Sequence, residues 1–331
     1  MSVDKPTRIV FMASDIIAIP ALEWCYDHDS ISLIGVFTQP DRRSGRGKKL
    51  LPNPIKTWAR EHGIEVRDPA KLSVEDADWL RNQEVDISLV MAYGQFLKTD
   101  MLEAPRIDTL NLHGSILPAY RGACPVEASI LNGDSETGVS LMKLVKKMDA
   151  GPVYAVKTLP IGNRINAAEL REQVGGICPE LLERALPGIV SGRLQAEEQD
   201  SARVSYVRKL FKSDALIDFR EDAASIERRS RAFYPWPGIA CEHDGEVLKM
   251  AGLRVEAASE NVAPPGTMVA AGAEMGIACG RGIIVPEKWQ RPGGKMLDAK
   301  DFFRGYPLSI GTVLNASQSP PVITKTPFEY S

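Results

Sequence analysis

The stretch DISLVMAYG (residues 86–94) decides the fold, because it is a strongly apolar run that ends at a glycine. Near-continuous apolar strands are typical of a sheet that is buried on both faces. The runs RIVFMA (8–13) and SLIGVFTQP (32–40) have the same character. Helix-like spacing separates these runs, as in IPALEWCYDH (19–28) and SVEDADWLRNQ (73–83). This alternation indicates βαβ units and predicts an α/β domain with a Rossmann-like, mostly parallel sheet.

The remainder of the chain divides at a polar segment. TLNLH (109–113) continues the predicted sheet, and residues 167–190 predict a helix that is interrupted around Gly175–Gly176. The polar segment 193–205 has no strong apolar period and is typical of a linker. Short strand-like runs punctuated by glycine and proline follow it and predict a small β-barrel. We therefore expect an α/β domain at 1–192, a linker at 193–205, a barrel domain at 206–314 and an extended tail at 315–331.

Composition excludes several classes of protein. The 331 residues are 44% hydrophobic and 25% charged, which is ordinary for a globular protein of two domains. No apolar run approaches the ~18 to 20 residues of a membrane span, and the first residues lack a secretory signal. The five cysteines are scattered, and the four histidines form no HxxxH or HxH pair, which argues against disulfides and zinc. We expect a cytoplasmic monomer with reduced thiols, no metal and no membrane partner.

The candidate chemistry lies in TLNLHGSILPAYRGACPVEASI (109–130). Asn111 and His113 alternate along the predicted strand, so their side chains share one face. They lie near its carboxyl end, which is the edge where ligands bind in open α/β sheets. An amide donor beside an imidazole is suited to hold an oxyanion and to exchange protons. The alternative is that Asn111 caps a loop and His113 binds backbone.

An acid follows in the predicted turn KKMDAGPVYA (146–155). This turn precedes an apolar strand and would return Asp149 towards the edge of the sheet. A carboxylate there would orient His113 or hold water for proton transfer. The alternative is that Asp149 only forms the turn before Gly151.

The motif N-L-H-G-S-I-L-P-A-Y-R-G (111–122), with M-D-A-G at 148–151, resembles the signature of the folate-dependent formyltransferases. The resemblance implies that Asn111, His113 and Asp149 surround the formyl group of 10-formyltetrahydrofolate, which is the donor. It implies direct acyl transfer to an amine, with neither a metal nor a covalent intermediate. The folate side is assigned to Met91, Ala92, Tyr93, Gly94, Ser115 and Pro118.

Members of this family act on glycinamide ribonucleotide, on amino sugars or on methionyl-tRNA, and some release formate. Residues after 205 resemble the OB-like, tRNA-binding C-terminal domain of the members that formylate initiator methionyl-tRNA. The basic segment TQPDRRSGRGKKLLPNPIK (38–56) resembles the loop with which those members hold the acceptor arm. The residues assigned to tRNA are Arg42, Arg43, Arg46, Lys48, Lys49, Arg208 and Lys209.

Two alternatives stay open at this point. A formyltransferase for an amino sugar nucleotide would share the trio Asn111, His113 and Asp149. A non-catalytic tRNA- or folate-binding relative would not require this trio. One departure concerns the loop after the first strand, where the family usually has F-x-G-T-P. This chain has Ala13, Ser14 and Asp15 there, so the family pattern does not define its contacts with the acceptor, whereas the transfer chemistry is unaffected.

Overall fold

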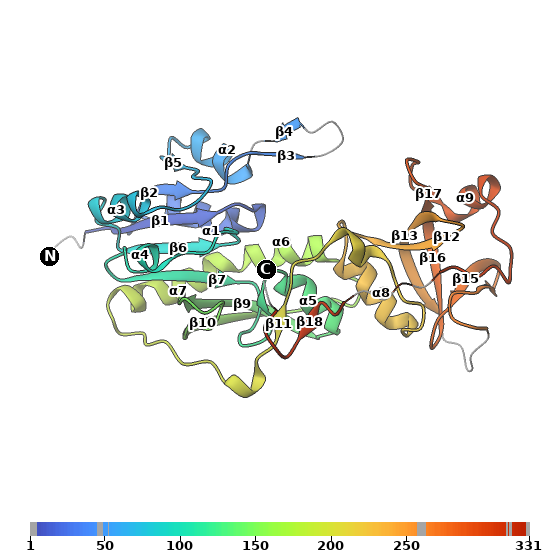
Figure 1. The fold of residues 1–331 in the computed structure, drawn as a ribbon. Helices are drawn as coiled ribbons and strands as arrows, with labels where there is room; N and C mark the ends of the chain where they lie inside the picture. Colours follow the sequence, from blue (N-terminus) through green and yellow to red (C-terminus); the bar gives the residue numbers. More distant parts are fainter. Residues whose placement is uncertain are drawn as a thin grey trace. The chain divides into compact units, whose positions relative to one another are not determined.

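The computed structural model describes residues 5–44, 49–51, 53–256, 263–315, 317 and 320–328. The chain forms two compact units, each of which is considered by itself (Figure 1). The first unit consists of Met1–Pro125, Glu136–Pro160 and Arg171–Tyr206. The second consists of Val126–Ser135, Ile161–Leu170 and Val207–Ser331. The chain therefore contributes two short internal segments to the second unit before the main part of that unit begins.

A seven-stranded sheet forms the centre of the first unit (Figure 1). Its strands are β1 (Thr7–Ala13), β2 (Ile31–Phe37), β5 (Val66–Arg67), β6 (Ile87–Met91), β7 (Asp108–His113), β9 (Glu136–Lys143) and β10 (Val153–Pro160). Their order is β10-β9-β7-β6-β1-β2-β5. The five strands from β5 to β7 are parallel, and β9 runs antiparallel to both of its neighbours. The predicted mostly parallel sheet is confirmed.

Helices cover this sheet because its strands are apolar on both sides. Val10 and Met12 pack in one core cluster with residues of the helices after β5 and β6, while Ile9 and Phe11 point the other way and are equally buried. The helices of the chain up to residue 190 are α1 (Ile19–Asp27), α2 (Pro54–Glu61), α3 (Val74–Asn82), α4 (Thr99–Leu102), α5 (Pro125–Asn132), α6 (Ala167–Gly176) and α7 (Cys178–Val190). The short 3-10 helix η1 (Ile16–Ala18) precedes α1.

The predicted interruption of the long helix is confirmed, because α6 ends at Gly176 and α7 begins at Cys178. Gly175 shows one reason for a glycine at this place. A Cβ on Gly175 would lie 2.6 Å from the carbonyl oxygen of Ile17, so only glycine permits this approach of the two backbones.

Antiparallel strands build the second unit. They are β12 (Ile239–His243), β13 (Glu246–Glu256), β14 (Met268–Ala271), β15 (Glu274–Ala278), β16 (Ile283–Gln290) and β17 (Leu297–Asp298). The helical elements here are η3 (Lys212–Ala215), α8 (Ala223–Ala232) and α9 (Ala299–Gly305), together with most of α5 and the first turn of α6, which lie in the two internal segments. The path β12-β13-β16-β15-β14 leaves two edges, and the segment 313–315 bridges both. Val313 pairs with Thr267 beside β14 and Asn315 with Glu242 of β12, which closes the sheet into a barrel.

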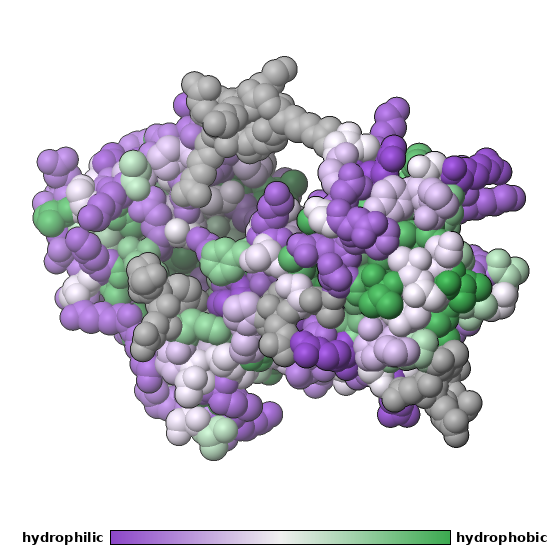
Figure 2. Space-filling model, turned by 45° about the vertical axis from the view of Figure 1, so that its right-hand side comes forward, coloured by the Kyte–Doolittle hydropathy of each residue, from purple (hydrophilic) through white to green (hydrophobic). Residues whose placement is uncertain are grey.

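The core of the barrel is aromatic. Trp289 of β16 is fully buried and stacks on Phe302 of α9, with ring centroids 5.6 Å apart. Phe219, Phe233 and Leu248 are fully buried as well. Most of the face shown in Figure 2 is hydrophilic, with hydrophobic residues in separate small groups. Many large apolar side chains pack in the two cores, and others, such as Ile16, Phe96 and Ile310, are exposed.

The segment predicted as a linker, 193–205, belongs to the first unit in this structure. Glu197 bridges to Val153 of β10, and η2 (Ser201–Arg203) follows. Three two-residue strands complete the elements: β8 (Arg121–Gly122), β11 (Tyr206–Val207) and β18 (Ile323–Thr324). The polar segment is therefore fixed along the α/β unit over much of its length.

Candidate active site

The order of the strands creates a ligand-binding edge in the first unit. The chain leaves β1 for β2 and β5 on one side and returns at β6 on the other side of β1. Ligands in such sheets bind outside the carboxyl ends of the strands at this reversal. Ser14 follows β1, Ala92 follows β6 and His113 ends β7, so all three residues lie at that edge.

Asn111 and His113 both lie on β7 and face the same side, as predicted. Asn111 is opposite Met142 of β9, and His113 is opposite Ser140. His113 is buried, with 5% of its surface exposed, whereas Asn111 is half-buried. Within the described part of the chain, the amide of Asn111 forms no hydrogen bond to another residue. That amide is thus positioned but uncommitted.

The imidazole of His113 is held by a backbone carbonyl. Its Nε2 lies 3.0 Å from the carbonyl oxygen of Tyr120. A carbonyl oxygen only accepts hydrogen bonds, so Nε2 carries the hydrogen in this contact and Nδ1 is the other available nitrogen. Tyr120 has a φ of 60°, and its N–H donates to Oγ of Ser205 at 2.9 Å. The ring orientation therefore depends on the conformation of Tyr120.

Asp149 lies beside Nδ1 of His113 without a direct hydrogen bond. Its Oδ2 is 3.8 Å from Nδ1, which exceeds hydrogen-bond length but suits attraction to a protonated ring. The same oxygen accepts the N–H of Gly122 at 2.8 Å. We expected Asp149 to orient the imidazole. In this structure Tyr120 provides that hydrogen bond, and Asp149 provides a nearby charge.

The turn that carries Asp149 has a constrained backbone. Asp149 adopts a φ of 46°, in the left-handed region that non-glycine residues rarely occupy. Two residues later, a Cβ on Gly151 would lie 1.9 Å from the carbonyl oxygen of Lys143, so no side chain fits there. Surrounding contacts must hold such a turn, since a residue in this conformation is strained.

Internal hydroxyl groups hold the loop between His113 and Gly122. Ser115 is fully buried, and its hydroxyl donates to the carbonyl of Ala119 at 2.6 Å. Ser140 donates to the carbonyl of Ser115 and accepts the N–H of Leu117. Ser115 was assigned to the folate, and in this structure its hydroxyl has an internal partner. Pro118, also assigned to the folate, is half-buried.

The segment after β6 presents its backbone rather than its large side chains. Met91 and Tyr93 are each 2% exposed, whereas Ala92 and Gly94 are exposed and have positive φ values of 47° and 77°. Burial, followed by the charge of Asp76, raises the pKa of the Tyr93 hydroxyl well above its usual value. Any contact of a ligand with this segment would therefore involve the backbone and the small residues.

Sequence reasoning missed two polar residues that join the strand ends. Oγ of Ser14 donates to the carbonyl of Tyr93 at 2.9 Å, and Nε2 of Gln39 donates to the same oxygen at 2.7 Å. The N–H of Gln39 also donates to Oγ of Ser14. Asp15, the acid that departs from the family pattern, caps η1 and pairs with Arg171 at 2.9 Å. Its charge is therefore partly neutralised within the first unit.

The arms of the basic segment form a two-stranded ribbon, β3 (Arg42–Ser44) and β4 (Lys49–Leu51). Arg42, Arg43 and Lys49 lie on these strands, while Arg46 and Lys48 lie outside the described residues. At the base of the ribbon, buried Lys56 pairs with Asp41 at 2.9 Å and with Asp68 at 2.6 Å. Burial alone would lower the pKa of Lys56, but its bonds to Asp68 and Asp41 raise it overall.

The two adjacent cations assigned to tRNA in the second unit differ sharply. Arg208 is buried, and its guanidinium makes five hydrogen bonds: two to Asp214 and one each to the carbonyls of Lys209, Pro320 and Pro321. A guanidinium has five N–H donors, so Arg208 has none left for a phosphate. Lys209 is exposed. Arg208 therefore serves the fold, and of the two only Lys209 enters the proposal below.

Residues of the predicted linker contact the trio's surroundings. Gln199 binds both Arg121 and the turn of Asp149, and Ser205 binds Tyr120. No sequence pattern pointed to them, because single polar residues in an aperiodic segment do not reveal a distant partner.

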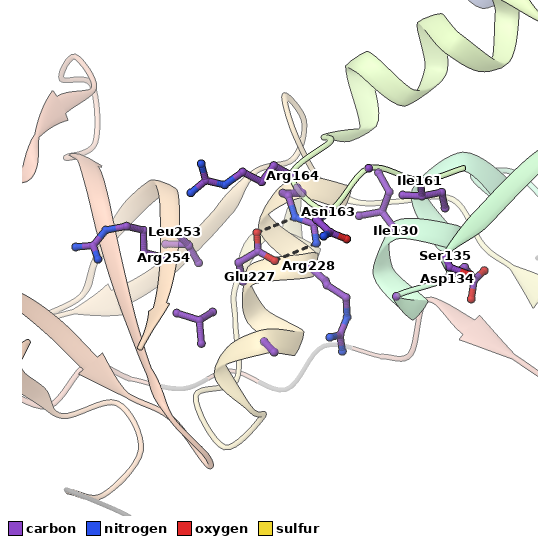
Figure 3. A pocket seen from close by; sticks show the side chains of 15 residues that line it. Ile130, Asp134, Ser135, Ile161, Asn163, Arg164, Glu227, Arg228, Leu253 and Arg254 are labelled. Carbon is purple, nitrogen blue, oxygen red and sulfur yellow. Dashed lines mark hydrogen bonds and ion pairs between the residues drawn. The ribbon is translucent and has the colours of Figure 1, made fainter. Parts of the chain in front are cut away.

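A pocket of about 600 Å³ lies in the second unit and is lined by residues of that unit (Figure 3). Four arginines line it, and two of them are neutralised: Arg231 pairs with Glu227, and Arg254 pairs with glutamates. Arg228 donates to Ser225, but its buried Nε has no partner in the described part of the chain. Arg164 is exposed and makes no hydrogen bond or ion pair with the described residues. The pocket thus retains donors for an anion.

Four of the five cysteines are buried and unsuited to act as nucleophiles. All five are free, and Cys25, Cys178, Cys241 and Cys279 are buried. Burial raises the pKa of Cys178 to about 12 and that of Cys241 to about 12, so their thiols stay protonated near neutral pH.

Within the described ranges, no group of three histidine, cysteine or acidic side chains is placed to hold a metal. No helix in that part of the chain is long and apolar enough to cross a membrane.

Known proteins resemble this chain over nearly its whole length. A methionyl-tRNA formyltransferase of Methylococcus capsulatus is 39% identical over 91% of this chain and 98% of the relative. One of Sorangium cellulosum is 39% identical over 93% of this chain and 99% of the relative. A solved N-formyltransferase of Helicobacter canadensis, in complex with folinic acid and dTDP-3-aminofucose, is 19% identical. It superposes with a TM-score of 0.61 over 85% of this chain and 99% of its own, which shows the shared fold.

Two family models match successive parts of the chain. Residues 8–186 match the formyl transferase family, and residues 209–307 match the formyl transferase C-terminal domain. The first match alone covers more than half of the sequence and includes all three residues of the trio. The chain therefore belongs to the formyl transferase family.

Proposed function

We propose that this chain transfers the formyl group of 10-formyltetrahydrofolate to the α-amine of initiator methionyl-tRNA, for translation initiation in the cytoplasm. One observation carries the proposal. Relatives named methionyl-tRNA formyltransferase match more than nine-tenths of the chain, including its second unit, at 35–39% identity. The geometry around Asn111, His113 and Asp149 supports the chemistry.

Asn111 is suited to stabilise the negative charge of the transition state. Attack of an amine on the formyl carbon places that charge on the formyl oxygen. The half-buried amide of Asn111 lies at the ligand-binding edge and makes no hydrogen bond within the described chain. A fixed donor in a partly dry site stabilises a developing oxyanion more strongly than water does, because it does not have to reorient.

His113 is suited to move the proton through Nδ1. The attacking amine becomes positively charged and must lose a proton, and the leaving N10 must gain one. Nε2 is committed to the carbonyl of Tyr120, so Nδ1 is the nitrogen that can take up and return the proton. The carboxylate of Asp149, 3.8 Å away, stabilises the ring while it is charged. The chain's own groups thus provide both the donor and the proton carrier.

The folate donor supplies the formyl carbon, and the edge after β6 fits its ring. The outward-facing parts of 91–94 are the backbone and the small residues Ala92 and Gly94. The side chain of Tyr93 is buried in the core. Its carbonyl oxygen accepts hydrogen bonds from Ser14 and Gln39, so it already has partners within the chain. A flat polar ring that reads backbone groups suits this surface better than a bulky one.

Basic residues on both units suit a phosphate backbone. Arg42, Arg43 and Lys49 lie on the ribbon of β3 and β4. In the second unit, Lys209 is exposed, and the pocket arginines Arg164 and Arg228 retain donors. Phosphate contacts position a nucleic acid without reading its sequence. We therefore assign these cations to general binding of the tRNA phosphates rather than to recognition of the initiator tRNA.

An amino sugar nucleotide is the second candidate acceptor. Solved formyltransferases of amino sugars share the fold at 18–19% identity, but a likeness at this level does not identify the substrate of this chain. The test is a parallel assay of radiolabelled formyl transfer to initiator methionyl-tRNA, elongator methionyl-tRNA and an amino sugar nucleotide. We expect the label on methionyl-tRNA, and preferential labelling of the sugar would overturn the proposal.

A further inference from the structure

Gln199, in the segment that joins the α/β unit to the rest of the chain, makes four hydrogen bonds with its side chain. Nε2 donates to the carbonyl of Asp149 at 2.9 Å and to the carbonyl of Gly151 at 2.7 Å. Oε1 accepts from Nε and Nη2 of Arg121 at 3.1 and 2.8 Å. Both amide hydrogens and both lone pairs are therefore used.

These partners fix the orientation of the amide. The two carbonyls only accept and the guanidinium only donates, so exchanging Oε1 and Nε2 would break all four contacts. Glutamate at this position would place a carboxylate oxygen against two carbonyl oxygens. The four contacts therefore require an amide. Glutamate has nearly the same shape as glutamine but cannot make all four hydrogen bonds.

The four bonds join the two sides of the Asp149 contact. On one side, Gln199 holds the backbone of Asp149 itself, whose φ of 46° needs support. On the other side it holds Arg121, whose neighbour Gly122 donates to Oδ2 of Asp149. Moving Gln199 would therefore change the position of the carboxylate relative to Nδ1 of His113.

We propose that Gln199 is a positioning residue for the formyl transfer step: it sets the distance between Asp149 and His113. This inference rests on the proposed function. All the residues involved lie within the first unit. Its effect acts through Asp149, since Gln199 contacts neither His113 nor Asn111 among the contacts of the described chain.

The test compares Gln199→Leu and Gln199→Glu with Gln195→Glu as a matched control. Gln195 lies in the same segment and also donates to a carbonyl, that of Gly192 at 2.8 Å, but this bond has no link to the turn of Asp149. We expect the Gln199 variants to lose ~10-fold or more in kcat, because small misplacements of reacting groups slow catalysis strongly. KM for both substrates should change little, and Gln195→Glu should match the parent.

A double-mutant cycle separates positioning from general support of the fold. If Gln199 acts through Asp149, adding Gln199→Leu to Asp149→Asn should slow transfer no further. Gln199→Leu should also alter the same limb of the pH–rate profile that Asp149→Asn alters. Additive losses, or parent-like turnover of both Gln199 variants, would overturn the inference.

Two controls keep the result clear. Thermal unfolding of each variant shows whether it is folded, and Gln199→Leu serves if Gln199→Glu is not. If both variants fail to fold, Gln199 supports the fold rather than the step, and the inference is overturned. Inactivity of the parent on methionyl-tRNA would instead count against the proposed function, so the two failures are distinguishable.

Discussion

The ligand-binding edge and the basic ribbon lie in the same unit but use polar groups in different ways. At the edge, internal hydrogen bonds hold the imidazole and the carboxylate: Tyr120 binds His113, and Gly122 binds Asp149, whereas the amide of Asn111 makes no hydrogen bond within the described chain. The ribbon of β3 and β4 is fixed at its base, where buried Lys56 binds Asp41 and Asp68. Its cations lie on a short two-stranded extension beyond that base.

The difference follows from what each region has to do. Transfer between bound groups depends on placement within a fraction of an ångström, so the edge needs internal hydrogen bonds. Attraction to phosphates depends on charge and reach and tolerates less exact placement. Substitutions at the edge should therefore change kcat, and substitutions on the ribbon should change KM and its salt dependence.

The largest effect is expected from Asn111→Ala, which removes the proposed oxyanion donor. Loss of one such donor lowers the rate by ~10² to 10³-fold. Steady-state formyl transfer should show the loss in kcat, with parent-like thermal unfolding. Asn82→Ala, at an exposed asparagine that ends α3 in the same unit, serves as the control. Full activity of Asn111→Ala would contradict the proposed role of the edge in the transfer step.

The ribbon is tested by the double variant Arg42→Gln/Arg43→Gln. We expect a severalfold higher KM for methionyl-tRNA and a flatter dependence of log KM on log salt, because fewer counterions are released on binding. KM for the folate donor should not change. Lys5→Gln/Arg184→Gln removes two charges from exposed ion pairs of the same unit and should behave as the parent. Equal salt slopes in the two double variants would contradict the role of the ribbon.

The base of the ribbon gives a prediction with a pH dependence. The hydrogen bond from Lys56 holds the pKa of Asp41 below its usual value of about 3.9. A lowered pKa stabilises the fold above the unfolded value, and this contribution disappears as the pH falls through the folded value. Lys56→Met should therefore lower Tm at pH 7, and the difference from the parent should shrink below about pH 4. A difference that stays constant with pH would show that Asp41 is not involved.

The smallest effect is expected from Lys209→Gln. It should leave Tm unchanged. It should also reduce the slope of log KM for methionyl-tRNA against log salt by about 1, because one phosphate contact is lost. Arg208→Lys, next to it, should do the reverse, because lysine cannot make the five hydrogen bonds of Arg208. A parent-like Tm for Arg208→Lys would show that those bonds contribute little.

The sequence predicted the fold well where periodicity reports burial. The apolar runs at 8–13, 32–40 and 86–94 correspond to β1, β2 and β6, because strands buried on both faces exclude polar residues. The place of Asn111 and His113 on β7 followed from alternation along that strand.

Partners that are distant in the chain could not be predicted in this way. Gln199 and Ser205 lie in a polar segment with no period, yet they bind the turn of Asp149 and the N–H of Tyr120. The same limit applies to Arg208, since its sequence neighbours show charge but not the carbonyls of Pro320 and Pro321 that it binds. Composition identifies a cation, and only the fold shows whether its donors are already used.

In the proposed reaction, His113 carries the proton during the transfer step. The most direct measurement is the single-turnover rate of radiolabelled formyl transfer from 10-formyltetrahydrofolate to initiator methionyl-tRNA, for the parent and for His113→Ala. Both substrates are saturating, so the rate reports the chemical step. We predict that His113→Ala is slower by ~10² or more, as for loss of a general acid–base group, with parent-like donor affinity and folding. Equal single-turnover rates for a folded His113→Ala variant would contradict the account.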